Sequence, residues 1–182
     1  MRFDKFTLKV QEALQEAQGL AGKYGQQGIE SEHLLIAFLE QPEGIVGTIL
    51  KKMGADPNVI EDKLKSAVEK MPRVQGAGAG QVYITPGLNR ILDQAMSEAA
   101  RLTDEYVSAE HILIAMADAK EGRASQILSE AGVTKDGIFK ALVEIRGNQR
   151  ITDPNPEDKY QALKRYARDF NELARKGSFD PV

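Results

Sequence analysis

The strongest constraint on the fold of this chain is that its sequence contains one unit twice. An offset of 78 positions carries Thr7 onto Thr85 and Glu32-His33 onto Glu110-His111. The same offset, without a gap, superposes further identical residues: Leu14 and Leu92, Ala17 and Ala95, Ala21 and Ala99, Ile36 and Ile114, Gly54 and Gly132, and Leu64 and Leu142. Internal repeats of this kind form similar structural units that pack on one another. We therefore predict two halves related by a pseudo-twofold axis, with the functional site at the seam between them.

Apolar residues recur at helical spacing in both copies. The stripe consists of Phe6, Val10, Ala13, Leu14, Ala17, Ala21 and Tyr24 in the first copy and of Leu88, Ile91, Leu92, Ala95, Ala99 and Leu102 in the second. Such spacing is typical of amphipathic helices. Thr7 and Thr85 stand where an N-cap belongs, and Pro86 follows at the first helical position, where a missing N–H costs nothing.

Three further helices are predicted in each copy. A loop over residues 25–31 or 103–109 leads to a short apolar helix over residues 34–39 or 112–117. A third helix follows around residues 49–53 or 127–131, with Gly54 or Gly132 as its C-terminal glycine. The last helix carries Ile60, Leu64 and Val68, or Ile138, Leu142 and Ile145. No convincing strand pattern is present, so the fold class is all-α: a pseudo-twofold duplicated four-helix repeat.

The sequence divides into one domain and a tail. The domain spans residues 1–147, with repeats at about 3–71 and 82–147 and a glycine-rich connector over residues 72–81. Residues 148–156 form a proline-containing linker. Residues 157–182 carry one more amphipathic stripe, from Tyr160 to Leu173, which predicts an extra helix that belongs to neither repeat. It could be a free helix, a coiled-coil arm or a docking helix for a following domain.

Composition excludes several classes of protein. The net charge is −3 and the isoelectric point is near 5.5, which argues against nucleic-acid binding. The chain has no cysteine, no signal peptide and no apolar run long enough to span a membrane. These features fit a cytoplasmic protein in a reducing compartment.

No catalytic or metal site is expected. His33 and His111, the two histidines, lie in different copies, and neither has a second histidine one helical turn away. Each should lie in the first turn of its helix as a neutral, hydrogen-bonded cap. The run from Gly76 to Gly80 lacks the Lys-Ser/Thr pair of a phosphate-binding loop. A hydrolase would need a nucleophile and base that this pattern does not supply.

A polypeptide-binding groove is the functional hypothesis that the residues themselves favour. Ile91 and Leu92 precede a loop with Asp104, Glu105 and Tyr106, and Glu110 follows. Apolar contact beside carboxylates suits extended polypeptide chains and selects against acidic ones. A solvated acidic face, on a purely structural helical adaptor, is the alternative.

Several motifs resemble one known family. The opening residues 1–7, the two Glu-His-Leu/Ile-Leu-Ile-Ala segments and residues 153–163 (DPNPEDKYQAL) are similar to the N-terminal domain of the Clp unfoldases. The amino-acid sequence of the linker resembles that of the disaggregase branch of the family rather than those of its protease-associated branches. Residues 169–182 resemble the lead-in to the first ATPase module, and no Walker motif follows. The chain is therefore expected to be a non-enzymatic fragment without cofactors, since ATP and magnesium belong to the missing modules.

The resemblance implies a function and site residues. The family's disaggregases are hexameric, ATP-driven machines that work with the DnaK chaperone system and bind unfolded or aggregated polypeptides through an N-domain groove. The polar positions tied to this activity match Thr7, Asp104 and Glu110, and the apolar face matches Leu88, Ile91 and Leu92. We expect the fragment itself to be a monomer. Docking of adaptors for a Clp protease unfoldase is the alternative function.

Overall fold

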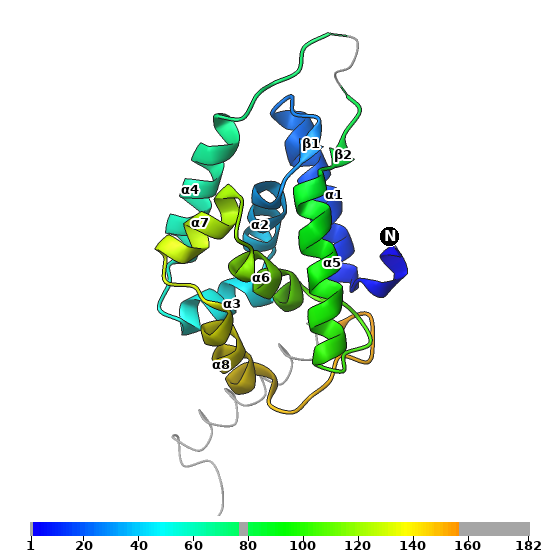
Figure 1. Ribbon diagram of the computed structural model, residues 1–182, viewed down its shortest axis with the longest axis vertical. Helices are drawn as coiled ribbons and strands as arrows, with labels where there is room; N and C mark the ends of the chain where they lie inside the picture. Colours follow the sequence, from blue (N-terminus) through cyan, green and yellow to red (C-terminus); the bar gives the residue numbers. More distant parts are fainter. Residues whose placement is uncertain (1, 77–79, 157–182) are drawn as a thin grey trace, which may run out of the picture.

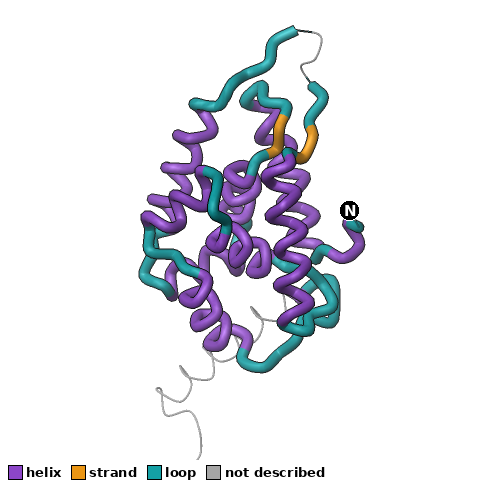
Figure 2. Tube along the Cα trace, viewed as in Figure 1, coloured by secondary structure: helices purple, strands orange, loops and turns teal. Residues whose placement is uncertain are grey.

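A computed structural model describes residues 2–76 and 80–156, and the helix predicted over residues 157–182 lies outside these ranges. The described chain contains eight α-helices, a short 3₁₀ helix and two very short strands (Figures 1 and 2). The first repeat comprises η1 (Phe3–Lys5), α1 (Leu8–Lys23), β1 (Gly28–Ile29), α2 (Ser31–Glu40), α3 (Ile45–Lys52) and α4 (Pro57–Glu69). The second comprises β2 (Tyr83–Ile84), α5 (Pro86–Arg101), α6 (Ala109–Asp118), α7 (Arg123–Glu130) and α8 (Lys135–Arg146). The predicted all-α, duplicated four-helix fold is confirmed.

The helices of the two repeats begin at equivalent positions, and their caps explain why. Thr7 and Thr85 accept hydrogen bonds from the N–H groups of Val10 and Leu88 at 3.4 and 3.3 Å, as predicted for N-caps. Gly54 and Gly132 follow α3 and α7 with φ angles of 78° and 77°, a left-handed conformation that favours glycine.

The central helices begin earlier than their apolar runs predict. α2 starts at Ser31 and α6 at Ala109, because the histidine three residues after each N-cap holds the first turn closed.

The repeats pack around these two central helices. Within each repeat, α2 packs on α1 and α4, and α6 packs on α5 and α8 (Figure 1). Across the seam, α4 contacts α7 and α3 contacts α8, which are pseudo-twofold equivalents. Residues 34–38 of α2 and 112–116 of α6 are buried on every side, as expected for helices enclosed by others.

Two strand pairings that the sequence did not predict tie the helix starts to the loops. Gly28 and Ile29 of β1 pair in parallel with Tyr83 and Ile84 of β2. Phe6 makes the equivalent parallel bridge to Val107 in the other half. These pairings are two residues long or shorter, too short for an alternating pattern to develop. A Cβ on Gly28 would lie 2.6 Å from the Thr85 side chain, so this close approach requires glycine.

The core includes residues that were expected to line a binding groove. Leu88 and Leu92 have no exposed surface, and Ile91 retains only 9%. Their apolar stripe faces inward, because α5 packs along α6. Leu88 and Leu92, which were expected to line the groove, are core residues, and Ile91 lies at the edge of the core.

The buried position of Leu92 leads to a stability prediction. We expect Leu92→Ala to lower the free energy of unfolding by about 2–5 kcal/mol, since it removes packed methyl groups and leaves a cavity. Urea denaturation measures this loss. Val143→Ala, at a side chain that is 68% exposed, is the control and should change stability by less than about 0.5 kcal/mol. Equal losses in the two variants would contradict the assigned packing.

Candidate functional site

A buried histidine organises the loop and central helix of the first repeat. His33 Nδ1 accepts the N–H of Glu30 at 2.9 Å, which leaves the proton on Nε2. Nε2 then donates to Gln26 Oε1 at 2.6 Å, and Gln26 Nε2 donates to the Val68 carbonyl at 2.7 Å. The ring therefore joins α2, the preceding loop and α4. Burial lowers the pKa of His33 to about 4, although its bond to the Glu30 backbone partly opposes this shift. The predicted capping role of this histidine is confirmed.

The second repeat has the same frame with charged partners. His111 Nδ1 accepts the N–H of Ser108 at 2.9 Å, and Nε2 donates to Asp104 Oδ2 at 2.8 Å. Asp104 Oδ1 also accepts from Arg146 Nη2 at 2.7 Å and from the Ile151 N–H at 2.8 Å. Burial raises the pKa of Asp104, but these hydrogen bonds and the charge of Arg146 outweigh it, so the pKa lies below its usual range.

Glu110 and Thr7 are buried as well. Arg146 Nη1 lies 3.5 Å from Glu110 Oε1, and neither carboxylate oxygen of Glu110 has a hydrogen-bond partner within the described chain. Arg146 thus lies between two buried carboxylates and compensates the charge of both. Thr7 is fully buried as the N-cap of α1. Thr7 is therefore the N-cap that the sequence predicts, whereas Asp104 and Glu110 do not form the expected exposed carboxylate rim.

A cleft of about 600 Å³ does open at the seam, in a different place. Both repeats contribute to it: the start of α2, the first half of α5, and the turn from α6 to α7. The edge of Ile91 and the half-buried Ala119 supply apolar surface. The charged side chains around it are Glu30, Glu32, Asp118, Glu121, Arg90 and Lys120. We refer to it as the seam cleft. Of the residues predicted to bind substrate, Ile91 alone lines it.

Carboxylates outnumber cations around the seam cleft. Glu32 is buried, and burial raises its pKa, although hydrogen bonds from its own backbone and from Ser31 oppose this. The N–H of Arg123, at the start of α7, also donates to it. Glu30 accepts from the Thr85 hydroxyl at 3.0 Å, and Asp118 lies 3.5 Å from Lys135. With four carboxylates and two cations on its lining, the cleft favours a cationic, partly apolar ligand.

Sequence reasoning missed the acidic residues of this cleft. One signal was available, because Glu32 is the repeat equivalent of Glu110, 78 positions before it in the sequence. Glu30, Asp118 and Glu121 carried no such signal. They meet only because α2, α6 and α7 converge across the seam.

In residues 2–76 and 80–156, no three histidine, cysteine or acidic residues are grouped so that they could hold a metal ion. None of the helices there combines the length and apolar character needed to cross a membrane.

The doubled four-helix fold and the open acidic cleft between its halves define the class, a duplicated all-helical domain. Residues 5–131 match the model of the Clp repeat (R) N-terminal domain family. The chain belongs to this Clp N-terminal domain family.

Named relatives agree with this assignment. The chaperone protein ClpB of Bacillus cereus is 39% identical over all of this chain, and that of Nitratidesulfovibrio vulgaris is 40% identical. The chain spans about a fifth of the length of these curated relatives (21%). Among solved structures, the Hsp104 N-terminal domain from Candida albicans superposes with a TM-score of 0.72 at 24% identity. That match covers 84% of this chain and 99% of the other. A ClpV N-domain in complex with a VipB peptide superposes with a TM-score of 0.62 at 19% identity, covering 78% of this chain and 86% of the other.

The lowered pKa of His33 predicts a pH dependence of stability. The ring's pKa is about 4 in the folded protein against 6.5 when unfolded, so on acidification the unfolded state binds the proton first. The contribution of His33 is complete above pH 6.5 and declines as the pH falls towards 4. We expect it to decrease by about 2 kcal/mol between pH 7 and pH 5.

Urea denaturation at several pH values tests this dependence. His33→Gln is the matched variant, because glutamine at this position can accept the N-cap N–H but does not titrate. Its stability curve should be flatter than the parent curve between pH 7 and pH 5. Parallel curves would contradict the assignment.

Proposed function

We propose that this chain is the polypeptide-binding N-terminal module of an ATP-dependent protein disaggregase, and that unfolded chains bind in the seam cleft. The observation that carries the proposal is a cleft of about 600 Å³ in which apolar surface at Ile91 and Ala119 lies among four carboxylates. Unfolded segments expose apolar side chains, and basic residues beside them would be attracted by those carboxylates.

The relatives support the same reading. Those that match the whole chain are named chaperones. A structural neighbour with this fold was solved with a peptide bound. Peptide binding on this fold is therefore physically feasible, and the acidic lining supplies a chemical preference of this chain's own.

The seam cleft lies at a different place on α5 from the groove that the sequence predicted. Leu88 and Leu92 stay in the core, and replacing Leu92 by a charged residue should unfold the domain rather than only weaken binding. Thr7, Asp104 and Glu110 are buried, so a client in the seam cleft would not touch them. Direct contact between these three residues and a client stays a prediction. Such contact would require the domain to open.

The activity of the whole protein is also part of the proposal. We propose that missing ATPase modules build a homohexamer, bind ATP and magnesium, and cooperate with the DnaK system. The chain itself would be a monomer without cofactor or turnover. Docking of a folded adaptor of a Clp protease unfoldase is the alternative function, and it would use a larger and flatter surface than a cleft for one or two side chains.

Charge reversal at the rim of the seam cleft tests the proposal. The double variant Asp118→Lys/Glu121→Lys changes two exposed residues. It should weaken binding of an unfolded peptide with apolar and lysine residues about tenfold at low salt, because attraction becomes repulsion. Fluorescence anisotropy measures the affinity, and a peptide with glutamate in place of lysine should lose this preference.

The repeat supplies a matched control. Glu40→Lys/Glu43→Lys changes the equivalent positions of the first repeat, adds the same charge and lies outside the seam cleft. Its effect should be small. Equal weakening in both double variants would indicate a general charge effect and contradict binding at the cleft. Tight binding of a folded adaptor with no measurable binding of unfolded peptide would favour the alternative function.

A further inference from the structure

The segment that leaves the second repeat is fixed to the domain by specific contacts. We refer to residues 147–155 as the exit segment. It runs from the end of α8 to the lower end of α5, orange in Figure 1. Ile151 is fully buried, although the surrounding sequence is polar and contains two prolines. A linker held only by covalent connection would not bury such a side chain.

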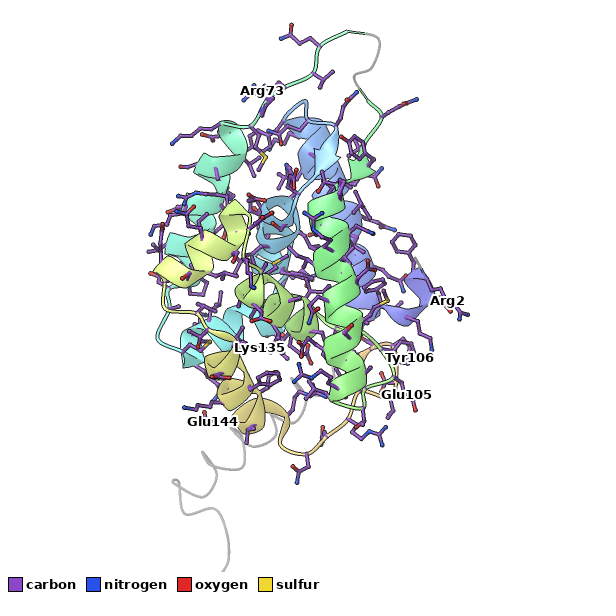
Figure 3. All side chains as sticks on the ribbon, in the orientation of Figure 1. Arg2, Arg73, Glu105, Tyr106, Lys135 and Glu144 are labelled. Carbon is purple, nitrogen blue, oxygen red and sulfur yellow. The ribbon has the colours of Figure 1, made fainter. Side chains whose placement is uncertain are left out.

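Asp104 holds the exit segment at its centre. One oxygen of its carboxylate accepts from both the Ile151 N–H and Arg146, at 2.8 and 2.7 Å. The Glu105 N–H donates to the Ile151 carbonyl at 2.8 Å, so both backbone groups of Ile151 are paired. Arg150 Nε adds a bond to the Thr103 carbonyl at 2.8 Å. Figure 3 places Glu105, with Tyr106, on the loop at the lower end of α5.

A second contact joins the exit segment to the first repeat. The N–H of Leu8, in the first turn of α1, donates to the Pro154 carbonyl at 2.9 Å. First-turn N–H groups have no partner within their own helix. The equivalent position at the start of α5 is Pro86, which has no N–H to satisfy. The two repeats therefore differ where the exit segment binds.

The comparison of the repeats shows what the charge of Asp104 adds. Gln26 is the equivalent residue and performs the shared task, because it accepts from its histidine and contacts the end of α4. Asp104 contacts its histidine in the same way and in addition binds Arg146 and Ile151. A carboxylate forms stronger hydrogen bonds than an amide, and here they run to the chain that leaves the domain.

We propose that Asp104 is a positioning residue that clamps the exit segment onto the second repeat and the start of α1. The clamp fixes the direction in which the chain leaves the domain. Arg146 links it to Glu110, so two of the residues that the sequence assigned to client binding belong to the clamp. Roughly 15 Å of helix separates Ile91 in the seam cleft from Arg101 at the other end of α5, so the clamp and the cleft are distinct places.

Limited digestion of the full chain with trypsin tests the clamp. The Arg150–Ile151 bond is a trypsin site whose far side is buried and hydrogen-bonded. Asp104→Ala should accelerate cleavage there about tenfold or more, as followed by mass spectrometry of the peptides that begin at Ile151. Gln26→Ala is the matched control, since it breaks the equivalent frame of the first repeat and should leave this cleavage at the parental rate.

A second variant keeps the test independent of general destabilisation. Leu8→Pro removes the N–H that binds Pro154 and copies the residue found at the start of α5, so α1 should form normally. It should accelerate cleavage at Arg150 by about threefold or more with an unchanged helical circular dichroism spectrum.

Two results would overturn the clamp. One is equal cleavage at Arg150 in the Asp104→Ala and Gln26→Ala variants. The other is an Asp104→Ala variant in which the Arg150–Ile151 bond is cleaved no faster than in the parent. Neither result depends on whether the seam cleft binds peptide, so the clamp and the proposed function can fail separately.

Discussion

Each half of this domain depends on one buried imidazole ring. His33 and His111 accept the N-cap N–H of a central helix on one nitrogen and donate to a loop residue from the other. The ring thereby closes the first turn of α2 or α6 and fixes the loop that leads into it. The outer helices pack against these two central helices. The histidine contacts therefore set the direction in which the chain enters α2 and α6. The contact requires an unprotonated Nδ1, and at His33 burial lowers the pKa of the ring.

The duplication lets one frame serve two purposes. In the first repeat the histidine's partner is the neutral Gln26, and Glu32, in the turn beside that ring, lines the seam cleft. In the second repeat the partner is Asp104, and the equivalent Glu110 is buried beside Arg146. One copy therefore has a carboxylate at a cleft, while the other uses two carboxylates to hold an arginine and the outgoing chain. The fold is nearly symmetric, but its polar residues are not.

The separation of cleft and clamp changes how substitutions should be interpreted. Loss of a function in an Asp104 or Glu110 variant does not by itself identify a contact with a bound polypeptide, because both side chains are buried in the clamp. Asp118 and Glu121, in contrast, are exposed at the cleft and take no part in the central helix caps. Substitutions of Asp104 or Glu110 therefore test the clamp, whereas substitutions of Asp118 or Glu121 test the seam cleft.

The sequence by itself determined the repeat, the eight helices, the threonine caps of α1 and α5 and the histidine caps of α2 and α6, because these follow from local periodicity and from residues a few positions apart. It could not determine which face of α5 is exposed, since the stripe of Leu88, Ile91 and Leu92 looks the same whether it lines a groove or a core. Because α5 packs along α6, Ile91 is the only one of these three residues that lines the cleft. The convergence of Glu30, Asp118 and Glu121, and the burial of Asp104 by Arg146 and Ile151, likewise depend on segments distant in the chain. Only the tertiary structure brings such segments together, and local sequence patterns do not predict these contacts.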